Sequence, residues 1–118
     1  MLKHKLMVLG VTALVALLAG CATAPATPQG AAVELATQRP ANCKFLGEVT
    51  GSHGNVFSGD FITDEKLIQG ARNDLRNKAA AMGANVVQVQ NTINSKHPYS
   101  AGIVKSTVVG AAFNCPGR

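Results

Sequence analysis

The chain of 118 residues has no tryptophan, one tyrosine and only six Asp and Glu residues, against eleven Lys and Arg residues. A ligand cage built from several aromatic rings is therefore not expected. General acid–base catalysis needs a base held in a pocket beside a residue that orients it. Glu34 and Glu48 are the carboxylates outside the region of the predicted helix, and neither belongs to a motif. We expect a protein that is not an enzyme and has no cofactor.

Residues 1–20 have the composition of a signal peptide. Lys3 and Lys5 precede residues 6–19, which are uncharged and almost wholly apolar. This stretch is shorter than the roughly 20 residues that span a bilayer. A basic start, a short apolar stretch and small residues after it predict a signal for export. Removal of this segment leaves nine basic and six acidic residues, so the net charge falls from +5 to +3.

The end of this segment, Leu-Ala-Gly-Cys at residues 18–21, resembles the bacterial lipobox. The resemblance implies that Cys21 is acylated and becomes the mature N-terminus, with two or more acyl chains that anchor it stably in a membrane. By resemblance to the bacterial sorting pattern, Ala22 favours the outer membrane, with the domain in the periplasm. The alternative is a soluble secreted protein that is cut after Ala24.

Residues 21–32, CATAPATPQGAA, contain small residues, two prolines and one glycine. Such a composition does not support a packed core, so we expect a flexible tether. A tether counted generously as about 20 residues has a stretched limit of roughly 70 Å. The rest of the chain, residues 33–118, is long enough for one small domain. It has no run of Lys or Arg and no interleaved aromatic residues, so we expect no nucleic-acid partner.

The clearest predicted element is an amphipathic helix over residues 64–82. Its apolar residues recur at spacings of three and four, which places them on one face. These residues are Leu67, Ile68, Ala71, Leu75, Ala79 and Met82. Thr63 or Asp64 can cap its start, and Gly83 can close its end. The later turns are basic through Arg72, Arg76 and Lys78, which indicates either a contact surface for anions or a solvated face.

Alternating or β-branched residues predict strands on both sides of this helix. The segments are 33–36, as a short edge strand, 45–50, 85–90 and parts of 101–115. Residues 91–100 are predicted to form a loop. We therefore expect an α+β domain with one amphipathic helix packed on a small sheet of three or four strands, in strand-helix-strand-strand order.

The connection at residues 51–62 is long for a small domain, and such connections are often functional. It contains no phosphate-binding glycine motif. We expect its glycines to permit rearrangement and its His53 and Phe57 to contact a partner, such as an envelope protein or a cell-wall component. Residues 94–100 are a candidate second part of this contact. Phe61 would either join this contact or fold back onto the core. The alternative function is a periplasmic module that binds a small ligand or a metal through this loop.

Two cysteines, Cys43 and Cys115, remain after the lipobox. In an oxidising periplasm they most simply form a disulfide. The bridge would close a loop of about 73 residues and stabilise the domain by roughly 4 kcal/mol. The alternative is a metal site that adds His53 and His97, although zinc ligands usually come in closely spaced pairs. We expect no metal.

The segments CKFLGEV at residues 43–49 and ARNDLRNKAAAMGANVV at residues 71–87, with the late Cys115, resemble an uncharacterised family of bacterial envelope lipoproteins. The chain is similar, more distantly, to the signalling domain of the Rcs envelope-stress sensor lipoprotein. The resemblance implies an outer-membrane lipoprotein with a disulfide-stabilised α+β domain and no catalytic site. Binding of another envelope component, or envelope stress sensing, is the function that it implies.

Overall fold

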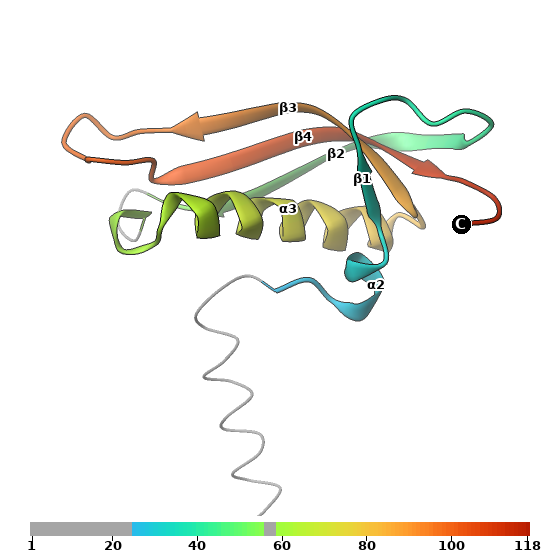
Figure 1. Ribbon diagram of the computed structural model, residues 1–118, viewed down its shortest axis with the longest axis horizontal. Helices are drawn as coiled ribbons and strands as arrows, with labels where there is room; N and C mark the ends of the chain where they lie inside the picture. The colour runs from blue at the N-terminus through green and yellow to red at the C-terminus, as the bar shows by residue number, and fades with distance from the viewer. Residues whose placement is uncertain (1–24, 56–58) are drawn as a thin grey trace, which may run out of the picture.

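The computed structural model describes residues 25–55 and 59–118. One long helix lies against one face of a four-stranded sheet (Figure 1), which confirms the predicted α+β class. In chain order the elements are α2 (Pro28–Ala31), β1 (Glu34–Ala36), β2 (Lys44–Gly54), the 3-10 turn η1 (Gly59–Phe61), α3 (Asp64–Ala81), β3 (Val86–Ser95) and β4 (Lys105–Asn114). Within the described ranges no helix combines the length and the apolar character needed to cross a membrane.

The strands lie in the order β1-β3-β4-β2. β4 pairs antiparallel with both β3 and β2, whereas the short β1 pairs parallel with β3 at the edge. β2 and β3 are longer than the sequence predicts, because the pairing of β4 with both strands continues as far as Lys105. Residues 51–54 and 91–95, which we predicted as loops, are therefore strand. The polar and glycine-rich composition of these segments disfavours a strand, but their backbone hydrogen bonds to β4 stabilise it.

The helix-facing core forms where α3 crosses β2 and β4. The predicted stripe is confirmed in part: Met82, at the C-cap beyond the last helical turn, is 38% exposed, whereas Leu67, Ala71, Leu75 and Ala79 are completely buried. They face buried side chains from the sheet, namely Val49, Val87, Val108 and Ala112. Thr63 caps the helix by accepting a hydrogen bond from the Lys66 amide at 3.3 Å, and Gly83 follows its end with φ +86°.

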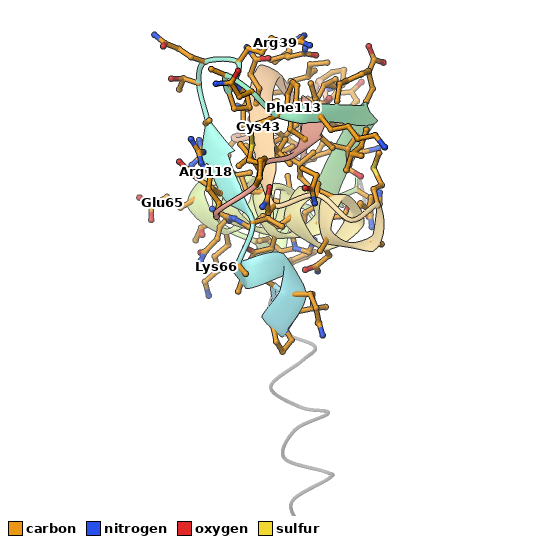
Figure 2. The ribbon with its side chains drawn as sticks, turned by 90° about the vertical axis from the view of Figure 1, so that its right-hand side faces the viewer. Arg39, Cys43, Glu65, Lys66, Phe113 and Arg118 are labelled. Atoms are coloured by element: carbon orange, nitrogen blue, oxygen red, sulfur yellow. A yellow bond between two sulfur atoms is a disulfide. The ribbon has the colours of Figure 1, made fainter. Side chains whose placement is uncertain are left out.

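A second cluster lies on the opposite face of the sheet. Its buried members are Val86, Ala111, Phe113 and Cys115. The ring of Phe45 lies 5.6 Å from that of Phe113, and the guanidinium of Arg39 lies 5.1 Å from the Phe113 ring. Figure 2 shows Arg39, Cys43 and Phe113 on the side of the domain opposite α2. This face has no covering helix, so these rings and Arg39 protect its apolar part from water.

Residues 25–32, which we predicted to belong to a flexible tether, are part of the domain. Residues 28–31 form helix α2, which packs against α3 through Asn77. The Asn77 amide oxygen accepts a hydrogen bond from the Thr27 amide at 2.8 Å, and its nitrogen donates to the Pro25 carbonyl at 3.2 Å. Gly30 is buried, and a Cβ at this position would overlap the Asn77 side chain. The side-chain amide of Asn77 thus holds residues 25–31 against α3 through hydrogen bonds with two backbone groups, although this segment has no apolar core of its own.

Candidate functional site

His53 is the one of the two predicted partner-binding residues that the structure describes. His53 is not in a loop but in β2, paired with Ser106, and its imidazole lies on Gly70 of α3. A Cβ at position 70 would overlap that ring, so glycine in the helix makes room for it. His53 therefore has a packing role. Cys21 and Phe57 lie outside the described residues.

Gly51 also has a different role from the predicted one. We expected it to permit rearrangement of a loop, but it is a buried residue of β2 that lies against the backbone of α3. Together with Gly70 it lets strand and helix approach closely, which is a structural use of glycine. The alternative function requires a ligand-binding loop over residues 51–62. Residues 51–54 of this segment belong to strand β2 and not to a loop.

Two connections that are distant in sequence meet at one end of the domain. Residues 59–63 lead into α3, and residues 96–104 join β3 to β4. Gly59 lies directly on the backbone of Val104, and Gly102 lies beside the Asp64 carboxylate. Figure 1 shows the start of α3 and the turn between β3 and β4 at the same end. We call residues 59–63 and 96–104 the loop end.

The loop end carries the two most exposed large apolar side chains of the described residues. Phe61 is 89% exposed and Tyr99 is 94% exposed. Phe61 does not fold back onto the core, which was one of the two possibilities that the sequence left open. Tyr99 was not singled out from the sequence, although it is the single tyrosine and follows Pro98 in a predicted loop. Large exposed aromatic side chains are typical of an interaction surface.

A cleft of about 340 Å³ adjoins Tyr99. Its lining residues come from both connections and from the start of α3, and they are Gly59, Ile62, Asp64, Tyr99, Ala101, Gly102 and Ile103. The lining combines apolar side chains with one carboxylate. A cleft with this mixed lining can accept a side chain of a partner.

The turn that carries Tyr99 is held by local hydrogen bonds. The Tyr99 amide donates to Nδ1 of His97 at 3.3 Å, and the Ser100 amide donates to the His97 carbonyl at 3.0 Å. The rings of His97 and Tyr99 are 5.6 Å apart. His97 therefore shapes the turn that presents Tyr99. A preorganised turn loses less conformational entropy on binding than a free segment.

The predicted disulfide is confirmed. Cys43, just before β2, and Cys115, just after β4, are bonded with an S–S distance of 2.10 Å. Their sulfur atoms are consequently not available as thiolate ligands for a metal. Within the described part of the chain, no group of three or more His, Cys, Asp or Glu side chains is placed to hold a metal ion.

Comparison with known sequences assigns the chain to a family. Residues 24–115 match the family described as "Domain of unknown function (DUF4156)". The chain is 32% identical over 109 residues to "Uncharacterized protein YjeI" from Escherichia coli strain K12 and from Shigella flexneri, and this region covers 91% of the chain and 93% of each relative. The expected membership of an uncharacterised family is confirmed: the chain belongs to the DUF4156 family.

Proposed function

We propose that this protein is a non-enzymatic outer-membrane lipoprotein whose periplasmic domain binds another envelope protein through the loop end. The observation that carries the proposal is the exposure of Phe61 and Tyr99 on two adjoining connections. Neither ring contributes to the two hydrophobic clusters of the domain. Large exposed aromatic side chains lower the solubility of a protein unless a partner covers them. Such side chains are enriched at the centres of interfaces.

The lipid anchor is supported by the sequence of residues 18–21, which resembles the lipobox. Pro25 lies only four residues after Cys21 and is already bound by Asn77. The disulfide between Cys43 and Cys115 suits a compartment that is oxidising, as the periplasm is. Envelope stress sensing is the more specific role that the resemblance to the Rcs sensor suggests for the same surface.

The anchor is tested by metabolic labelling with a fatty-acid probe. The Cys21→Ala variant should remain an unprocessed precursor and incorporate no label. The Thr23→Ala variant changes a residue just after the lipobox, leaves the disulfide intact and should be labelled like the unmodified protein. Labelling of Cys21→Ala at the normal level would contradict the proposed anchor.

The binding surface is tested by crosslinking intact cells and isolating the protein from the membrane. Phe61→Ala and Tyr99→Ala, singly and together, should reduce recovery of the principal crosslinked protein by at least about tenfold, because hot-spot side chains contribute more than about 1.4 kcal/mol each. Ile93→Ala, which removes an exposed apolar side chain from the open face of the sheet, should leave recovery unchanged. Equal recovery in all variants would place the interface elsewhere.

A further inference from the structure

A groove with charged and apolar walls runs between α3 and the β1 edge of the sheet. It has a volume of about 320 Å³. Apolar atoms come from Leu35, Ala36 and Val89, and the α3 side is formed by Arg72 and Arg76. Figure 2 shows β1 on the same side of the domain as Arg118, which pairs with Glu34 of β1.

The same two arginines line a second depression farther along α3. Its other lining residues are Glu65, Ile68 and Gln69. Glu65 contributes the carboxylate in the lining of this second depression, and in the described structure it forms no ion pair with Arg72 or Arg76. Arg72 and Arg76 therefore stand where the two depressions meet, with an apolar floor on the β1 side. This combination suits a ligand that has an anionic group attached to an apolar part.

Within the described residues, neither Arg72 nor Arg76 forms an ion pair, and the two stand one helical turn apart on the same face of α3. The ion pairs among residues 25–55 and 59–118 are Lys78–Asp74 and Arg118–Glu34. The Arg76 guanidinium donates to the Asn73 amide oxygen of the same helix at 3.2 Å. Burial and, secondarily, the charge of Arg72 lower the pKa of Arg76 from its ordinary value. Like charges four residues apart repel on a helix, and an anion between them would relieve this repulsion.

The path of the chain places this helix face near the proposed membrane anchor. Asn77, the residue after Arg76, binds both Pro25 and Thr27. Pro25 follows Cys21 by four positions, a distance of at most about 14 Å when the chain is fully extended. This span is much shorter than the roughly 70 Å of the tether expected from the sequence. The surface of the anchoring membrane is thus within reach of the α3 face that carries the arginines.

We infer that Arg72 and Arg76 bind the phosphate of an anionic lipid headgroup in the membrane that holds the anchor, while Leu35 and Val89 contact the glycerol and upper acyl part of that lipid. The inference rests on the proposed lipid anchor. Guanidinium groups match phosphate oxygens through paired hydrogen bonds, and basic residues near a membrane are attracted to anionic lipids. Such binding would hold α3 toward the membrane and turn the open face of the sheet, with Arg39, away from it.

The test measures the protection of arginine side chains from phenylglyoxal in the lipidated protein, reconstituted in nanodiscs. Modification of each arginine is followed by peptide mass spectrometry. Replacing about one fifth of phosphatidylcholine by phosphatidylglycerol should slow the modification of Arg72 and Arg76 by at least about fivefold, as anionic headgroups occupy the two groups. Modification of Arg39 and Arg118 in the same molecules should change by less than about twofold, since both lie outside the groove.

Native mass spectrometry of protein released from the same nanodiscs gives a second readout. The unmodified protein should retain phosphatidylglycerol. The Arg72→Gln/Arg76→Gln double variant should lose it, and Arg39→Gln should retain it, because Arg39 lies on the opposite face of the sheet. Circular dichroism establishes that the double variant is folded, as expected for side chains that form no ion pair with the described carboxylates.

The other results would each contradict one specific claim. Equal modification of the two arginines in both lipid mixtures would overturn the headgroup site, and so would retention of phosphatidylglycerol by the double variant. Equal protection by inorganic phosphate in pure phosphatidylcholine would show a site for free anions instead of a lipid. The intact mass of the protein reports acylation of Cys21 separately, so an unacylated protein would contradict the proposed anchor itself, whereas an acylated protein with unprotected arginines would contradict only this inference.

Discussion

The backbone of Gly51 in β2 lies directly against the backbone of Leu75 in α3, with no room for a side chain between them. A Cβ at position 51 would overlap the amide nitrogen and Cα of Leu75 and the carbonyl oxygen of Ala71. These atoms belong to the hydrogen-bonded backbone of a long helix and cannot move separately. Gly51 therefore sets the distance between the helix and the sheet.

Substitution of Gly51 by alanine should lower the free energy of unfolding by about 1–3 kcal/mol, because the added methyl group must push α3 away from β2. Urea denaturation measures this change. Thr50→Ala is the matched control: its side chain is exposed, and its effect should stay within about 0.5 kcal/mol. A Gly51→Ala variant as stable as the unmodified protein would contradict the described contact.

Asp74 and Lys78 of α3 cap the free edge of β2. The Ser52 amide donates to the Asp74 carboxylate at 2.9 Å, and Lys78 donates to the Thr50 carbonyl at 3.2 Å. The two side chains also form an ion pair at 3.0 Å. An uncovered strand edge is a template for pairing with other chains. The helix thus satisfies β2 groups that the sheet leaves unpaired.

Asp74→Ala should accelerate hydrogen exchange of the Ser52 amide by about tenfold, the equivalent of about 1.4 kcal/mol for a hydrogen bond to a charged group. Exchange is measured residue by residue with NMR spectroscopy. Glu65→Ala removes a carboxylate from the first turn of the same helix and should not change exchange at Ser52. Unchanged exchange in Asp74→Ala would show that the carboxylate does not protect this amide in solution.

Reduction of the disulfide should destabilise the domain substantially. Cys43 and Cys115 are 72 positions apart, so opening the bridge releases a long loop in the unfolded chain, which costs roughly 4 kcal/mol. The melting temperature should fall on addition of a reductant. In the Cys43→Ala/Cys115→Ala variant the reductant should have no further effect. Two thiols that can be alkylated in protein isolated without a reductant would contradict the bridge.

Aromatic side chains in different places should differ sharply in their contribution to stability. Phe113 is completely buried, and its replacement by alanine should cost about 3–5 kcal/mol. Phe61 and Tyr99 are almost fully exposed, so their replacement should change stability by less than about 0.5 kcal/mol. Thermal unfolding of the three variants measures the contrast. A large loss of stability in Tyr99→Ala would assign this ring to the scaffold and not to a binding surface.

Local sequence patterns were sufficient to predict the helix and the approximate position of each strand. The apolar stripe and the residues Thr63 and Gly83 predicted a helix over residues 64–82, and α3 spans Asp64–Ala81. These signals act between residues that are near in sequence. The pairing of Cys43 with Cys115 was also predicted, because few cysteines leave few possible partners.

Features that depend on distant contacts could not be predicted in the same way. The glycine-rich residues 51–54 and the polar residues 91–95 have weak strand signals, but pairing with β4 makes both segments strand. His53 was assigned to a loop because the space that Gly70 provides on α3 is apparent only in three dimensions. The loop end likewise depends on contact between two connections about 40 residues apart. The sequence therefore indicated each connection but not that the two lie in contact.

Site-specific photocrosslinking in living cells tests the proposed function most directly. A photoreactive phenylalanine analogue placed at Tyr99 should crosslink to one main envelope protein, and Phe61→Ala in the same chain should abolish that product. The same analogue placed at Ile93, on the open face of the sheet, should not give it. Absence of a protein crosslink from position 99, or the same product from position 93, would contradict a binding surface at the loop end.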